Sequence, residues 1–178
     1  MTIEALIKAV PPPASPFQAF SGPWEPVEAE IGRELPQDYK EFARLYGSGH
    51  WFDFMGVYVP RTRNPWSRLE RQVRMVCDTF FDRDELPYLL WPVQEGLVPF
   101  GQTDNGDYLF WRPRGVLKDW GVAVWDRGSG DFETFDCDLT DLLAGLATGG
   151  IRPEILPEDF YPIPNLFNSH SEPSQPEG

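Results

Sequence analysis

Hydrophobic and polar residues alternate along this 178-residue chain with two periods, one typical of helices and the other of strands. Apolar residues recur three or four positions apart after Pro36, which suits a first helical turn, and this pattern ends at Gly47. A second helical pattern begins at Ser67, and a third follows Asp138, which we expect to cap its helix. The sequence therefore predicts helices over residues 36–46, 67–81 and 138–146, with a shorter one over residues 25–33.

The helix predicted from Ser67 carries its own start signal. Ser67 and Glu70 have the spacing of a capping box, in which each side chain bonds a backbone N–H of the first turn. One face of this helix is apolar, and it is formed by Leu69, Val73, Val76, Cys77 and Phe80. We therefore expect the Cys77 thiol to be packed rather than reactive.

The remaining periodic segments read as strands: one or two around Gly56, then residues 97–100, 107–112, 121–126 and 131–135. Short turns separate the later strands, as is typical of antiparallel pairs. Asn105-Gly106 favours a two-residue type I′ turn, whereas a calcium loop would need alternating oxygen ligands and a distant bidentate Glu. The predicted fold class is α+β, with an antiparallel sheet and helices packed on it in a single domain.

Both faces of the predicted sheet carry apolar side chains. Leu109 and Trp111 point one way, while Tyr108 and Phe110 point the other way. We expect helices to cover one face. The other face would be covered by loops and the Pro-rich C-terminal segment, or left partly open to a partner.

The composition of the sequence changes twice along the chain, which divides the chain into three segments. Residues 1–20 form an N-terminal segment with a Pro-rich spacer, residues 21–150 the α+β domain, and residues 151–178 a Pro-rich extension. The first part of this extension holds too many prolines for a helix and too many apolar residues to stay in water, so we expect it to lie across the domain. The last stretch, "NSHSEPSQPEG", is expected to be disordered.

Charge and composition narrow the range of partners. The formal net charge of −13 would repel nucleic-acid phosphates and attract a basic partner, although such acidity can also serve solubility alone. Two cysteines are too few for a disulfide framework, and no apolar run approaches the ~20 residues that span a bilayer. The first residues also lack a secretory-signal pattern. We expect a cytoplasmic protein without a cofactor, a metal or a membrane partner.

Candidate catalytic groups form no recognisable constellation. A dyad of His50 with Cys77 or Cys137 stays an open alternative, as does a pair of strand-end carboxylates, but no spacing singles out an acid and a base. Five arginines lie between Arg61 and Arg74, around Trp66. They form either an anion site or, as we favour, a solvated helix face balanced by acidic residues. We predict no catalytic residue.

Three segments, taken in order, resemble the SUKH superfamily, which includes bacterial immunity proteins against polymorphic toxins and fungal regulators of cell-wall synthesis. They are "LPQDYKEFARLYGSG", "LVPFGQTDNGDYLFWRP" and "GVAVWDRGSGDFETFDCDLTDLLAGLATG". The residues that carry the resemblance are Leu35-Pro36, Tyr39, Phe42, Phe100-Gly101, Gly106-Asp107, the strand at Val122–Asp126 and Asp138-Leu139. The resemblance covers residues 24–148, and it departs from compact members in the long insert over residues 61–96 and in the C-terminal extension.

This resemblance implies an α+β fold and a non-catalytic module that binds another protein, often a nuclease or other toxin domain. We therefore expect an immunity protein that neutralises a cognate toxin by occlusion, with acidic groups steering a basic partner. The alternative is a scaffold or regulator of cell-envelope or signalling proteins. The residues predicted to contact the partner are Asp104, Asp107, Trp111, Trp125, Asp126, Asp131, Glu133 and Asp136.

Overall fold

A computed structural model describes residues 3–80, 86–157, 160–161, 163 and 165–172 of the chain. The elements follow in the order α1 (Glu4–Ala9), α2 (Glu25–Ile31), α3 (Gln37–Leu45), β1 (Gly49–Trp51), β2 (Met55–Val57), α4 (Leu69–Phe80), β3 (Val98–Thr103), β4 (Tyr108–Arg112), the 3-10 turn η1 (Leu117–Asp119), β5 (Gly121–Trp125), β6 (Phe132–Phe135), α5 (Leu139–Thr148) and β7 (Phe167–Ser169). Asp138 caps α5 as predicted, because its carboxylate accepts a hydrogen bond from the Asp141 N–H.

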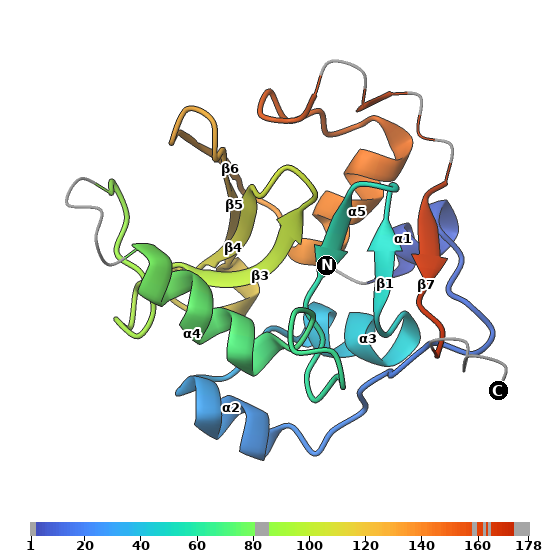
Figure 1. Cartoon of the computed structure of the whole chain (residues 1–178), viewed down its shortest axis with the longest axis horizontal. Coiled ribbons are helices and arrows are strands. Elements are labelled where there is room, and N and C mark those ends of the chain that lie inside the picture. Colours follow the sequence, from blue (N-terminus) through green and yellow to red (C-terminus); the bar gives the residue numbers. More distant parts are fainter. Residues whose placement is uncertain (1–2, 81–85, 158–159, 162, 164, 173–178) are drawn as a thin grey trace, which may run out of the picture.

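The strands form one seven-stranded sheet in the order β6-β5-β4-β3-β2-β1-β7. Every neighbouring pair of strands is antiparallel, which confirms the predicted α+β class. The first six strands are neighbours in their sequence order, and the long connection between β2 and β3 contains α4. β7, drawn in red in Figure 1, comes from the C-terminal extension and lies beside β1 at one edge of the sheet.

Alternate residues of the central strands enter two different apolar cores. Leu109 and Trp111 belong to the larger core, to which α1, α3 and α5 contribute. Phe110 and Trp125 belong to a smaller core on the opposite side, together with Val76 of α4. Figure 1 shows α4 (green) on one side of the sheet and α5 (orange) on the other. The alternation of facing directions predicted for these strands is therefore confirmed.

The Pro-rich segment does not cover the face that carries the smaller core. Loop residues Leu86, Tyr88 and Leu90 pack there instead. The Pro-rich segment lies on the α5 side, where the Tyr161 hydroxyl donates to the Leu146 carbonyl at 3.0 Å and Ile151 packs against the larger core. Loops cover the second face as expected, together with α4, whereas the expectation that the Pro-rich segment lies there is wrong, because that segment packs against the larger core and α5.

Both ends of the described chain join the same folded unit. Leu6 of α1 and Val10 are buried in the larger core. At the other end, Asn168 and Ser169 form part of β7, so the disorder expected from residue 168 onward is wrong for these two residues. The expected disorder of residues 173–178 lies outside the described residues.

Two local predictions are corrected by the hydrogen bonding. The capping box does not form, because the Ser67 hydroxyl donates to Thr62 Oγ1 at 3.1 Å and the Glu70 carboxylate lies 3.1 Å from Arg61 Nε. In the β3–β4 hairpin, only Gly106 has a positive φ, of 88°, and its N–H donates to the Thr103 carbonyl at 3.0 Å. The loop is therefore a three-residue turn ending in a left-handed glycine, not a type I′ turn.

One irregularity in β3 decides which of its side chains face the core. The pairing register shifts between Pro99 and Gly101, as in a β-bulge. Phe100, the extra residue at the shift, is buried in the larger core. After the shift, Gln102 pairs with Tyr108, so its side chain lies on the opposite face of the sheet.

Candidate functional site in the polar half of the sheet

A row of paired residues crosses the sheet on the α4 side. Its side chains are aromatic in one half and polar or small in the other. From β6 to β7 the row reads Phe132, Trp125, Tyr108, Gln102, Gly56, His50 and Asn168. The aromatic half belongs to or packs against the smaller core. The polar half runs from β3 to β7 and is the candidate site. Its residues Gln102, Gly56 and His50 line a hollow.

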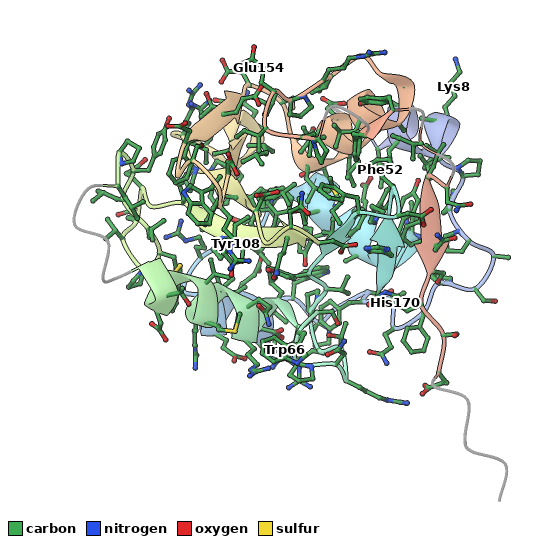
Figure 2. The ribbon with its side chains drawn as sticks, turned by 45° about the horizontal axis from the view of Figure 1, so that its top comes forward. Lys8, Phe52, Trp66, Tyr108, Glu154 and His170 are labelled. Atoms are coloured by element: carbon green, nitrogen blue, oxygen red, sulfur yellow. The ribbon has the colours of Figure 1, made fainter. Side chains whose placement is uncertain are left out.

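The hollow over the polar half has a volume of about 410 Å³. Gly56 leaves room in its floor, since a Cβ added there would meet no atom of the described residues within 4 Å. Trp66, in the loop before α4, and His170, next to β7, both line it (Figure 2). A second hollow of about 760 Å³ continues from it past Arg63 to Glu172. The two hollows share Asn64, Ser67 and His170.

Hydrogen bonds hold the side chains of this groove in place. His50 Nε2 lies 3.1 Å from Asp104 Oδ1, and the Tyr58 hydroxyl donates to Gln102 Oε1 at 3.2 Å. Burial, and secondarily the charge of His50, keeps the pKa of His170 below its usual value. A neutral ring is thus favoured in the contact between His170 Nδ1 and the Ser48 hydroxyl, which are 2.9 Å apart.

The Ser48–His170 contact does not read as a nucleophile and its base. Ser48 is only 2% exposed, so a substrate has no access to its hydroxyl. Among the described residues, the ring of His170 accepts or donates no other side-chain bond that would orient it for proton transfer. The geometry instead suits a preformed surface whose polar groups are fixed before anything binds.

The two tryptophans predicted to contact a partner are core residues. Trp111 is 1% exposed and packs edge-on against Tyr39 with ring centroids 4.8 Å apart. Trp125 is 2% exposed and stacks on Tyr108 at 5.9 Å. Neither ring reaches the surface, so the expectation that they provide aromatic contacts to a partner is corrected. Trp66, by contrast, lies beside the candidate site and is 63% exposed.

Asp107 was also predicted to contact a partner, but its side chain is buried, with 4% of the residue exposed. Its carboxylate accepts the Thr103 hydroxyl at 2.6 Å and the Arg127 backbone N–H at 3.1 Å. Because Thr103 lies in the β3–β4 hairpin and Arg127 in the β5–β6 turn, Asp107 ties these two turns together. Its role is structural, since a partner has almost no access to this carboxylate.

Replacing Asp107 with alanine is expected to lower the free energy of unfolding by about 1–2 kcal/mol, because the Thr103 hydroxyl and the Arg127 N–H lose their acceptor. Urea denaturation measures this change. The matched control is Asp131→Ala, at an exposed position of the β5–β6 turn, which we expect to change stability by less than about 0.5 kcal/mol. Equal effects at the two positions would contradict the connecting role.

The other predicted carboxylates do not form one patch. Asp104, Asp126 and Asp131 lie in the two turns at one end of the sheet. Hydrogen bonds, chiefly from the Gly128 backbone N–H, lower the pKa of Asp126. Glu133 Oε2 instead accepts the Ile155 N–H at 3.3 Å. Asp136, at the other end of β6, binds Arg112 and Arg114 at 2.5 and 2.8 Å.

Several arginines between Arg61 and Arg74 form ion pairs with carboxylates or lie over an aromatic ring. Arg61 pairs with Glu30 and Glu70, and Arg63 pairs with Glu172. Arg71 lies over the Trp66 ring, 4.9 Å from its centroid. This arrangement agrees with the interpretation as a balanced surface. Sequence reasoning missed Trp66 as a surface aromatic, although its position in the polar turn "RNPW" before a helix was a usable signal.

Among the described residues, no group of three or more His, Cys, Asp and Glu side chains is placed to hold a metal ion. Nor do these residues include a helix with the length and apolar content that crossing a bilayer requires.

Comparison with known families identifies a family to which the chain belongs. The SUKH_6 family model, described as SMI1-KNR4 cell-wall, matches residues 23–143. The matched region runs from before α2 into α5 and includes β1 to β6, while α1 and β7 lie outside it. No curated protein and no solved structure matches the chain. Since the family model covers more than half of its residues, the chain belongs to the SUKH superfamily.

Proposed function

We propose that this chain is a non-catalytic protein-binding module that neutralises a cognate toxin by covering its active surface. The observation that carries the proposal is the preformed polar groove with Trp66 exposed at its side. Tryptophan is among the residues that most often dominate the binding energy of protein interfaces. A groove on a rigid sheet, with its side chains already hydrogen-bonded, lowers the entropy lost on association.

The charge of the chain supports a basic partner. The net charge is −13, and Asp104, Asp126 and Asp131 lie in the two turns at one end of the sheet. Such a field speeds the encounter with a positively charged surface. A nuclease carries a surface of this kind because it must bind phosphates. An acidic protein that covers this surface would exclude the nucleic acid.

The direct test begins with the tagged full chain, retrieved from native lysate at low and moderate salt. We expect one basic protein that dissociates as the salt concentration rises. Expression of that protein alone should then arrest growth, and co-expression of this chain should restore it. A captured protein that has no effect on growth would overturn the immunity function.

Trp66→Ala is expected to weaken binding of the captured partner by about tenfold or more, because the mutation removes the exposed ring beside the groove. Folding stability should change by less than about 0.5 kcal/mol. The matched control is Leu89→Ala, which removes a side chain of similar exposure, 62%, that does not line either hollow of the groove. Calorimetry or surface plasmon resonance measures the affinity. Equal losses for both variants would contradict a role of Trp66 as an anchor.

The regulator of envelope or signalling proteins is the second candidate, and one observation favours it. The C-terminal extension lies outside the family match, yet it supplies β7 to the sheet and residues to the groove. A dedicated inhibitor does not require such an addition. Several envelope or signalling proteins, retained regardless of salt, would favour this candidate in the same capture experiment.

A further inference from the structure

β7 occupies a sheet edge that the family-matched part of the chain leaves open. The match ends at residue 143, so the sheet built within it ends at β1. β7 then pairs antiparallel with β1 over three residues, with Trp51 opposite Phe167 and Gly49 opposite Ser169. Backbone bonds extend this pairing at both ends, from the Phe52 N–H to Leu166 and from the His170 N–H to Ser48, each at 3.0 Å.

The β1 edge also contains a slot that fits an aromatic ring. The Phe167 ring lies above Gly49, where any Cβ would collide with it. Trp51 and Tyr46 form the walls, with ring centroids 4.5 and 5.6 Å from that of Phe167. Both wall residues are 0% exposed when the slot is filled. The lack of a side chain at Gly49 therefore creates a site whose shape and chemistry select an aromatic residue.

The other bonds that hold β7 are polar and lie near the surface. Asn168 donates to an Asp53 carboxylate oxygen at 2.6 Å, and the Ser169 hydroxyl accepts the Phe17 N–H at 3.3 Å. Exposed polar bonds of this kind contribute little net stability, since water replaces them readily. Within β7 itself, the apolar contribution comes from Phe167. Any extended chain can supply the backbone bonds, so the ring sets the specificity.

We infer that the β1 edge and its aromatic slot form a docking site for an extended segment of a partner protein that carries an aromatic residue in the register of Phe167. In the free chain, β7 occupies this site, and the partner segment displaces it. Displacement also withdraws His170 and Glu172 from the hollows that they line. Occupation of the edge would therefore reshape the groove. This inference does not depend on whether the partner is a toxin.

The test uses a fluorescent peptide of residues 165–172, "NLFNSHSE", and its counterpart with alanine in place of phenylalanine. The full-length Phe167→Ala variant empties the slot, and we expect it to bind the phenylalanine peptide at least about tenfold more tightly than the alanine peptide. The wild type should bind far more weakly, because its tethered β7 competes at an effective concentration of about millimolar. Fluorescence anisotropy measures both affinities.

Leu89→Ala is the control, since it removes an exposed side chain that lines neither the slot nor the two hollows, and it should behave as the wild type does. Equal affinity of the Phe167→Ala variant for the two peptides would overturn the aromatic selectivity of the slot. Because no toxin takes part, the outcome is separate from the test of the proposed function.

Hydrogen exchange of the wild type tests displacement without any mutation. The amides of Phe52 and His170 bond across the β1–β7 boundary, whereas the Tyr58 amide bonds to Phe100 at the β2–β3 boundary. We expect the first two to exchange at least about tenfold faster than the third, because a short edge strand opens without global unfolding. Equal protection of all three amides would show that β7 leaves only when the whole domain unfolds, and would overturn the inference.

Discussion

Replacing Trp111 with alanine is expected to lower the free energy of unfolding by about 3–5 kcal/mol. The ring is buried in the larger core, 4.8 Å from the Tyr39 ring and 5.1 Å from the Phe100 ring between centroids. Both neighbours are fully buried, so the cavity cannot fill without moving the sheet or α3. Chemical denaturation of the purified chain measures the change.

A second substitution separates lost packing from lost hydrogen bonding at this position. The indole N–H of Trp111 is buried and has no hydrogen-bond partner among the residues that the structure describes, so Trp111→Phe removes an unsatisfied donor together with part of the ring. We expect a smaller loss, about 1–2 kcal/mol. Trp66→Ala, at an exposed ring, should leave stability nearly unchanged. A loss at Trp111 no larger than at Trp66 would contradict the assignment of Trp111 to the core.

The Asp38→Asn variant is expected to be more stable than the wild type above pH 7, by about 1–3 kcal/mol. Burial, and then the charge of Asp138, raises the pKa of Asp38 to about 6. The unfolded chain has a pKa of about 3.9 at this residue, so ionisation costs more in the folded state. An asparagine side-chain oxygen can still accept the Thr140 N–H, which Asp38 Oδ2 accepts at 3.3 Å.

The sign of the effect follows from the protons bound in each state. Between about pH 4 and pH 6 the folded wild type holds a proton on Asp38 that the unfolded chain releases, so wild-type stability from this group falls as the pH rises. The advantage of Asp38→Asn should therefore be absent near pH 4 and complete above pH 7. Urea denaturation at pH 4.5 and 7.5 measures it. Asp131→Asn, at an exposed turn, serves as the control. A variant less stable than the wild type at pH 7.5 would show that the carboxylate is net favourable.

The regular elements of this protein could be predicted because their signals are local. The spacing of Tyr39, Phe42 and Tyr46 marks α3, and all three side chains are buried as the period requires. The cap at Asp138 and the alternation in β4 likewise depend on neighbouring residues only. The capping box was predicted wrongly because its side chains bond residues outside the motif. Arg61, in the loop before α4, pairs with the Glu70 carboxylate, and the spacing of Ser67 and Glu70 alone gives no sign of this ion pair.

The candidate site was less predictable, because exposure depends on what covers each strand. Trp111 and Trp125 face opposite sides of a sheet that is covered on both sides, so alternation gave no indication of which ring was accessible. The groove itself combines β1, β2, β3 and the C-terminal end of the described chain. His50 and His170 are 120 positions apart in the sequence but line one hollow. Only the sheet topology brings them together.

The register shift in β3 has a consequence for comparing this chain with other members of its superfamily. If β3 kept its six residues but paired with β4 without the bulge, the side chain of Gln102 would turn into the core and position 101 would face the groove. Two members with matching letters after Phe100-Gly101 would then display different surfaces. Partner specificity within the family should therefore be compared only after the bulge in β3 has been located, since its loss at unchanged strand length exchanges the lining and interior positions of the residues that follow it.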